Sequence, residues 1–363
     1  MKKRINKSSA TATGSATATA PLFQASAAYL GIDVSKEHFD AALCLSHERI
    51  RQDTVCQRFT NDAKGIRAFD KWITTQGVGI ALRPALVVVM ENTGIYHRRL
   101  WQYCCDHNLH ATIGNAADIK WSFGLVRGKN DLTDSIRLCD YAYRHADRLR
   151  QVDPFDEDVL LLKDLYAARR RLIRQLQALQ VALGELKDTN KKAAQSALEK
   201  INKPAIEGLS KALKLVEAEI KALIKGNERM NNNYRLVMSV PGIGHVTAVY
   251  LICPTANFIG KPTGKQLACY AGVAPFENTS GSSIKGKGHV NRMANKELKR
   301  LLHMGARSVS THNKEARTYY ERKAAEGKHD LVIINAVKNK MLLRVAAVVR
   351  EGRAYVDKSR IAA

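Results

Sequence analysis

Hydrophobic and polar residues follow both strand and helix periods in the first 150 residues, which predicts a mixed domain. Two apolar runs in AAYLGIDVSKEHFDAALCL, starting at Ala27, are separated by a polar turn, as in a β-hairpin that opens a sheet. The continuous apolar run from Ala85 to Met90 is typical of a strand buried on both faces. Alternation of strands and helices then indicates an α/β domain over residues 27–150. The other expected elements are helices over residues 62–76 and 96–108 and a short strand over residues 110–114.

Between residues 156 and 226 the apolar pattern takes helical spacing. Leucines recur at alternating steps of three and four residues from Leu162 to Leu186, with Arg169 in the missing step. A polar break containing Pro204 follows, after which the same spacing returns from Leu209 to Leu223. We therefore expect a long helical coiled-coil arm over residues 151–230. The stripe fits a hairpin within one chain and packing between chains equally well.

The last segment, residues 231–363, is expected to be a mostly α domain with two glycine-containing turns. The stretch LVMSVPGIGHVTAVYLI has the turn pattern of a helix-hairpin-helix, which presents backbone N–H groups at a helix N-terminus to phosphate. Gly242 and Gly244 are therefore candidate nucleic-acid contacts. A plain tight turn between helices explains the same pattern equally well. A second, Gly- and Lys-rich loop is expected from Gly281 to Gly288.

Composition adds an expected class of partner to this outline. The 363 residues include 58 Lys and Arg against 34 Asp and Glu, a net charge of +24 that points to a polyanion, with nucleic acid the leading candidate. Residues 1–26 are predicted to form a disordered basic tail. No apolar run approaches the roughly 18 to 20 residues of a membrane span, so no membrane partner is expected. Seven cysteines without a CxxC pair favour a reducing cytoplasm over a disulfide framework or a zinc ribbon.

Four carboxylates of the first domain form a candidate metal site. Asp33 lies inside an apolar strand, where an unpaired charge is costly, and Glu91 ends the second strong strand. Asp131 and Asp134 begin a helix, and their spacing puts both on one side of it. Such a set can hold two Mg²⁺ ions, or Mn²⁺, around a phosphoryl group in transfer. Taken singly, each acid also fits a helix cap, a first-turn acid or a local ion pair.

A basic stretch in the last domain forms a candidate nucleic-acid interface. Its glycines allow close approach of the backbone to a phosphate, and its lysines and arginines supply charge, although a solvated surface would have the same composition. Ser280 lies just before this stretch and is a candidate nucleophile, in competition with Thr279, Ser282 and Ser283. The candidate contacts are Gly281, Lys285, Lys287, Arg292, Lys296, Lys299 and Arg300, together with Arg127 and Lys129 before the first-domain helix.

These motifs resemble a family of bacterial insertion-sequence transposases. The shared segments, in family order, are YLGIDVSKEHFDAAL, MENTGIYH, GKNDLTDSIRLCDYA, PGIGHVTA, LACYAGVAPFENTSGSSIKGKG and NRMANKELKRLL. The family joins an N-terminal RuvC-like, ribonuclease-H-fold DEDD domain to a C-terminal serine-bearing transposase domain, and its members are bridge-RNA-guided recombinases. The sequence departs from the family pattern at Asn130, Ser135 and Ala294, and the last departure is expected to affect the geometry of DNA contact more than the chemistry.

The resemblance implies roles for the residues and partners for the chain. Asp33, Glu91, Asp131 and Asp134 would be the metal ligands, and Ser280 the nucleophile of a covalent phosphoserine intermediate. The expected assembly is a homotetramer, a dimer of dimers, in which the acids of one subunit meet the serine of another. Expected partners are donor DNA, target DNA and a structured noncoding guide RNA, in the nucleoid of a bacterial cytoplasm.

Three other functions fit parts of the same pattern. A metal-dependent nuclease of the Holliday-junction type would use the acids without the serine. A non-enzymatic RNA- or DNA-binding scaffold would need neither group. An actin-like or sugar-kinase ATPase would share the GIDVS strand, but it requires a glycine-rich phosphate loop that DVSKEHFD lacks.

Overall fold

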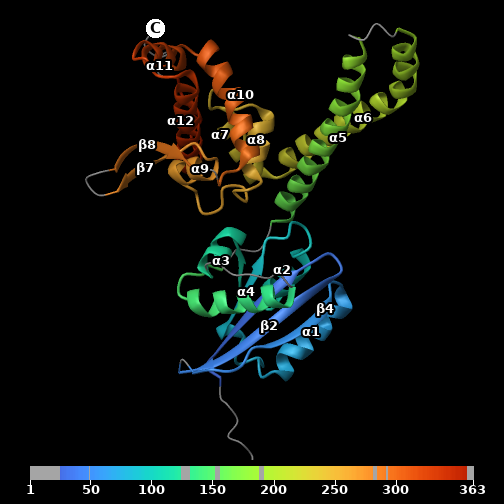
Figure 1. The fold of residues 1–363 in the computed structure, drawn as a ribbon, viewed down its shortest axis with the longest axis vertical. Helices are drawn as coiled ribbons and strands as arrows, with labels where there is room; N and C mark the ends of the chain where they lie inside the picture. The colour runs from blue at the N-terminus through green and yellow to red at the C-terminus, as the bar shows by residue number, and fades with distance from the viewer. Residues whose placement is uncertain are drawn as a thin grey trace, which may run out of the picture. The chain divides into compact units, whose positions relative to one another are not determined.

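The computed structural model describes residues 25–48, 50–123, 131–151, 156–187, 192–280, 284–291 and 293–357. Almost all of the predicted basic tail, residues 1–26, therefore lies outside the described residues. The chain divides into two compact units, residues 1–154 and 155–363 (Figure 1). No helix among the described residues is long and apolar enough to cross a membrane.

The first unit is a mixed sheet with helices, as predicted. Its strand order is β3-β2-β1-β5-β6, with β4 also paired to β2. β1 and β2 form the expected antiparallel hairpin, whereas β1, β5 and β6 are parallel. The strands are β1 (Ala27–Val34), β2 (His38–His47), β3 (Ile50–Arg51), β4 (Val55–Thr60), β5 (Leu86–Glu91) and β6 (His110–Gly114).

The helices of this unit also lie close to their predicted positions. Asp62 caps the first of them by accepting a hydrogen bond from the Gly65 N–H, which explains where it begins. The helices are α1 (Ala63–Thr75), α2 (Arg98–Asp106), α3 (Ala116–Ser122) and α4 (Asp131–His145), with a short 3₁₀ helix, η1 (Arg83–Ala85).

Helix α4 packs directly on the middle of the sheet, against β1, β2 and β5. Close contact is possible because Gly31 has no side chain: a Cβ there would lie 2.1 Å from the Cys139 N atom and 2.2 Å from the Ser135 carbonyl oxygen. On the same face, Leu138 packs with Val89 of β5. The backbone of α4 is thereby held tightly over β1 and β5.

The second unit begins with two long helices, α5 (Glu157–Lys187) and α6 (Lys192–Gly226), which pack on each other as a hairpin. The break predicted at Pro204 is wrong, because Pro204 lies inside α6. A proline in a helix removes one backbone hydrogen bond and favours a bend without necessarily ending the helix. Figure 1 shows that α6 changes direction along its length. Whether copies of this hairpin form a coiled coil between chains stays a prediction.

The rest of the second unit is mostly helical, as expected, and shares one core with the base of the hairpin. Leu162 and Ile220 of the hairpin belong to the same buried cluster as Val249, Leu302 and Leu342. The remaining helices are α7 (Glu228–Met238), α8 (His245–Ile252), α9 (Gly264–Tyr270), α10 (Lys296–His312), α11 (Lys314–Ala325) and α12 (Asp330–Glu351).

A two-stranded sheet replaces most of the loop predicted from Gly281 to Gly288. β7 (Pro275–Ser280) pairs with β8 (Ile284–Val290) in an antiparallel hairpin, and residues 281–283 lie outside the described residues. The pairing shifts by one residue between Phe276 and Asn278. At Gly288 a Cβ would lie only 3.1 Å from the Phe276 carbonyl oxygen. This glycine therefore serves strand pairing at an irregular point of the hairpin, which its sequence pattern did not distinguish from a loop.

Candidate functional site

Two of the four predicted acids end neighbouring parallel strands. The strand register pairs Ile32 of β1 with Met90 of β5, so Asp33 and Glu91 occupy the next position on each strand. Both residues are partly buried. Because paired residues on adjacent strands share a face, these two acids lie side by side at the carboxyl edge of the sheet.

The other two acids begin the helix that covers this face. Along β1, Tyr29 contacts Tyr143 of α4, with ring centroids 5.1 Å apart, whereas Gly31 lies against Ser135. Each two-residue step along the strand thus moves toward the N-terminus of α4. One further step brings the position of Asp33 to the first turn of α4, which carries Asp131 and Asp134. From this spacing we expect the four acid positions to lie at one edge of the sheet.

The chemistry of this set suits a divalent cation, since carboxylate oxygens are the ligands that Mg²⁺ and Mn²⁺ prefer. In the present arrangement Asp134 accepts a hydrogen bond at Oδ1 from Arg137, 2.7 Å away. The side chain of Asp131 lies outside the described atoms. Among the residues that are described, no three His, Cys, Asp or Glu side chains are close enough to hold a metal ion. The role of the four acids as ligands therefore stays a proposal.

A further buried carboxylate, which the sequence analysis missed, adjoins Asp33. Asp40 of β2 is the register partner of Asp33 and is only 2% exposed. Arg58 of β4 donates two hydrogen bonds to it, with Nε–Oδ1 and Nη2–Oδ2 distances of 2.9 and 2.7 Å. The bidentate pair compensates the buried charge of Asp40 and places a guanidinium beside the acidic edge. Its sequence signal was the polar Asp40 within the apolar run FDAALCL.

The candidate nucleophile lies in the other unit. Ser280 is the last residue of β7 and pairs with Ile284, next to the tip of the hairpin that Figure 1 shows extending from the helices. The side chains of Ser280, Lys285 and Lys287 are not among the described atoms. Four other predicted contacts lie outside the described residues altogether: Arg127, Lys129, Gly281 and Arg292.

Three predicted basic contacts begin α10, directly after the hairpin. Lys296 is exposed, Lys299 is half-buried, and Arg300 donates a hydrogen bond to Glu297 at 2.8 Å. Glu297 also accepts a hydrogen bond from Tyr166 of α5, at 3.3 Å. The Arg300 interaction, followed by a smaller opposing effect of burial, keeps the pKa of Glu297 below its ordinary value. Arg300 therefore takes part in the hydrogen bonds that connect α10 to α5 through Glu297.

The turn at Gly242 is shaped by packing. Its backbone has φ +86°, and a Cβ at Gly305 of α10 would lie 2.0 Å from the Gly242 carbonyl oxygen. Two glycines thus allow α10 to approach the turn, which favours the plain tight-turn alternative at Gly242. Gly244 is exposed and precedes α8, so it remains available to a ligand.

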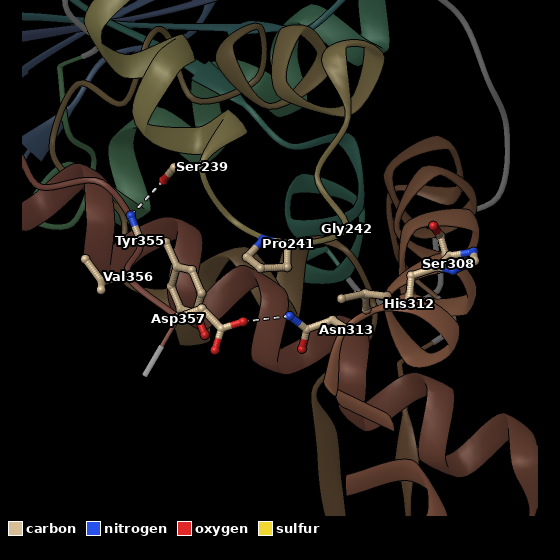
Figure 2. A pocket seen from close by; sticks show the side chains of 10 residues that line it. Ser239, Pro241, Gly242, Ser308, His312, Asn313, Tyr355, Val356 and Asp357 are labelled. Atoms are coloured by element: carbon tan, nitrogen blue, oxygen red, sulfur yellow. Dashed lines mark hydrogen bonds between the residues drawn. The ribbon is translucent and has the colours of Figure 1, made fainter. Parts of the chain in front are cut away.

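A cavity of about 530 Å³ opens beside this turn (Figure 2). The chain after α12 forms one side, where the Tyr355 N–H donates a hydrogen bond to Ser239 and Asp357 accepts one from Asn313. A carboxylate on the lining does not favour an anion in the cavity itself. The cavity therefore adds no support to phosphate binding at Gly242.

Comparisons with known proteins match both ends of the chain. Residues 30–186 match a family model described as a transposase, of the DEDD type named for IS110, and residues 234–321 match one described as "Transposase IS116/IS110/IS902 family". The "Pilin gene-inverting protein" of Moraxella bovis is 28% identical over 336 residues, which span 90% of this chain and 97% of that protein. The "Transposase for insertion sequence element IS1111A" of Coxiella burnetii is 27% identical over 209 residues, 51% of this chain and 56% of that protein.

The matched regions contain the two parts of the candidate site. The first includes Asp33, Glu91, Asp131 and Asp134, and the second includes Ser280 and the basic residues of α10. Both family models describe transposases and name IS110, and they match successive regions of this one chain. The chain therefore belongs to the IS110/IS116/IS902 family of insertion-sequence transposases and carries its DEDD transposase domain.

Proposed function

We propose that this protein is an RNA-guided recombinase of an insertion sequence, which cuts and rejoins DNA with the four acids and Ser280. The proposal is supported by the register that makes Asp33 and Glu91 neighbours on β1 and β5, and by the packing of α4, which begins with Asp131 and Asp134, on these strands. A divalent cation held there by Asp33, Glu91, Asp131 and Asp134 would stabilise charge on a scissile phosphate.

The serine step balances as a transesterification. The Ser280 oxygen forms a bond to phosphorus while the bond from phosphorus to a deoxyribose oxygen breaks, and the serine proton passes to a base or to the leaving oxygen. A deoxyribose hydroxyl of the recombining strand then attacks the phosphoserine and releases the serine. No phosphodiester bond is lost, which suits a protein related to one named for inverting a gene.

Two features support the proposed partners, namely the positive charge of the chain and the exposed apolar side chains of α5 and α6. A net charge of +24 suits simultaneous binding of donor DNA, target DNA and a guide RNA. The α5–α6 hairpin exposes apolar side chains at Val181, Ile201 and Leu215, which supports contact between subunits in a tetramer. In such an assembly, the acids of one subunit can serve the serine of another.

The test is recombination between two plasmids, together with trapping of a protein–DNA adduct on a nicked substrate. Ser280→Ala should abolish both signals, and the matched control Ser283→Ala should retain both. Asp33→Asn should abolish recombination while the melting temperature stays close to that of the wild type. A normal adduct yield in Ser280→Ala would refute the serine mechanism, and the nuclease alternative would then account for cleavage that still depends on Asp33.

Guidance by RNA is tested separately in the same plasmids. Recombination should require a structured RNA transcribed from the DNA flanking the gene, and changing its unpaired loops should redirect the products. Recombination at the original sites without any RNA would refute guidance but leave the chemistry intact.

A further inference from the structure

Asn61, between β4 and α1, connects the two segments that follow the strand acids. Its side-chain amide nitrogen donates hydrogen bonds to the carbonyl oxygens of Ser35 and Tyr96, at 2.9 and 3.0 Å. Ser35 lies two residues after Asp33 of β1, and Tyr96 lies in the loop between Glu91, which ends β5, and helix α2. A single amide group therefore joins the chain beyond one acid to the chain beyond the other.

This bridge lies where strands β1 and β5 separate. The register that pairs the two strands ends one residue before the acids. Asp33 pairs instead with a residue of β2, and Glu91 with one of β6. The pairing of β1 with β5 therefore does not extend to the acids themselves, and Asn61 supplies hydrogen bonds between the two segments just beyond them.

Neighbouring hydrogen bonds hold Asn61 itself in place. Its backbone N–H donates to the carbonyl oxygen of Glu37 in the β1–β2 turn at 2.9 Å, and its own carbonyl oxygen accepts from Arg99 of α2 at 3.3 Å. Thr60, before it, is paired with β2, and Asp62, after it, caps α1. The backbone of Asn61 is thus bonded to the same two parts of the chain as its side chain.

The orientation of the Asn61 amide follows from its partners. Both are carbonyl oxygens, which accept hydrogen bonds and do not donate them. Turning the amide over would place Oδ1 against them and lose both hydrogen bonds. In the present orientation Oδ1 is buried and has no hydrogen-bond partner among the described residues. Both donations are therefore kept although this acceptor stays unsatisfied.

We propose that Asn61 is a positioning residue for Asp33 and Glu91 as ligands of a divalent cation. The proposal rests on the proposed function, because it takes from that function the cation that the acids would hold. Two carboxylates bind one cation well only when their oxygens stand at a set separation. Asn61 does not touch the cation. It holds the chain beyond each acid, and so keeps the two strand ends at the separation that the cation requires.

The test measures binding of Mn²⁺ to the full chain without nucleic acid, by electron paramagnetic resonance of the free ion. Asn61→Ala removes both hydrogen bonds without changing the charge, and it should raise the dissociation constant for Mn²⁺ about tenfold. The matched control is Tyr103→Phe, which removes a hydrogen bond from α2 to Asp70 of α1. Both variants should lower the melting temperature, but Tyr103→Phe should bind Mn²⁺ as the wild type does.

Hydrogen exchange gives a readout that involves no metal. The amides of residues 33–37 and 92–96 should exchange faster in Asn61→Ala than in the wild type, and in Tyr103→Phe they should not. Faster exchange with an unchanged dissociation constant for Mn²⁺ would reduce Asn61 to a structural role and overturn the proposal. Unchanged exchange would overturn it as well, since the two segments would then not depend on this amide. If Asn61→Ala does not fold, Asn61→Ser, which keeps one hydroxyl donor, must show the raised dissociation constant for the proposal to stand.

A third variant separates this proposal from the proposed function. Asp33→Asn should abolish the binding of Mn²⁺ that the wild type shows. If it does, and Asn61→Ala binds Mn²⁺ as the wild type does, the metal site stands and the positioning role fails. If Asp33→Asn binds Mn²⁺ as tightly as the wild type, or if the wild type binds none, the acids are not a metal site and both proposals fail together.

Discussion

Gly31 is the position where helix α4 and strand β1 come closest, so Gly31→Ala is a severe test of the fold and of the site together. The added Cβ would lie 2.1 Å from one α4 backbone atom, 2.2 Å from a second and 2.6 Å from a third. All three are backbone atoms, so no side-chain rotation relieves the contact. Helix α4 must move away from the sheet by an ångström or more, or β1 must distort.

We expect this change to cost about 3 kcal/mol, at the upper end of the range for overpacked cores. For a unit of this size, that corresponds to a fall in melting temperature of roughly 6 to 12 °C, measured by calorimetry on the full chain. Recombination should fall further than stability predicts, because an ångström of misplacement between Asp134 and Asp33 can cost on the order of a hundredfold in rate.

The matched control is Gly79→Ala in the same unit, where a Cβ would meet nothing within 4 Å. Its free energy of unfolding should stay within about 0.5 kcal/mol of that of the wild type. If Gly31→Ala unfolds at the wild-type temperature and recombines normally, α4 does not lie on β1 as described, and the argument that brings the four acids together fails.

Two further predictions concern the second unit. Glu297→Gln should lower stability by about 1 to 2 kcal/mol at pH 7, because hydrogen bonds from Arg300 and Tyr166 to a charged carboxylate are lost. Since the pKa of Glu297 is lowered on folding, its contribution is complete above the ordinary carboxyl pKa of about 4.5 and disappears as the pH falls below that value. The difference in melting temperature between the two proteins should therefore shrink as the pH falls below about 4.5, and a difference that stays constant as the pH falls would contradict the ion-pair explanation. Gly208→Ala, in the middle of α6 with nothing within 4 Å, should raise stability by about 1 kcal/mol, and a fall in melting temperature would instead indicate that another chain packs there.

Local patterns predicted most elements well because each pattern reflects burial along a single segment. The strand ending at Glu91 and the helix beginning at Asp131 appear where apolar periodicity indicated them. Prediction failed where the structure of one segment is seen only together with another segment of the chain. Pro204 reads as a break, but α6, which packs on α5, continues through it. Likewise, the stretch from Ile284 to Gly288 reads as a loop until β7 supplies its hydrogen-bond partners.

The candidate site shows the same division. Its four acids and its serine were recognisable from residue type, order and resemblance. By contrast, Asp40 had no local signal beyond being polar in an apolar run, and its importance became clear only from its register with Asp33 and its bond to Arg58.

By itself, the sequence determined the outline of this protein. It is a strongly basic chain with an α/β domain that contains the four candidate acids, a long helical arm and a mostly helical domain that contains the candidate serine. These properties depend on composition and on periodicity within single segments. Only the tertiary structure decided which buried charge is compensated and by which partner, as with Asp40 beside Arg58. The reason is physical, since the free energy of a buried charge depends on partners that lie far away along the chain.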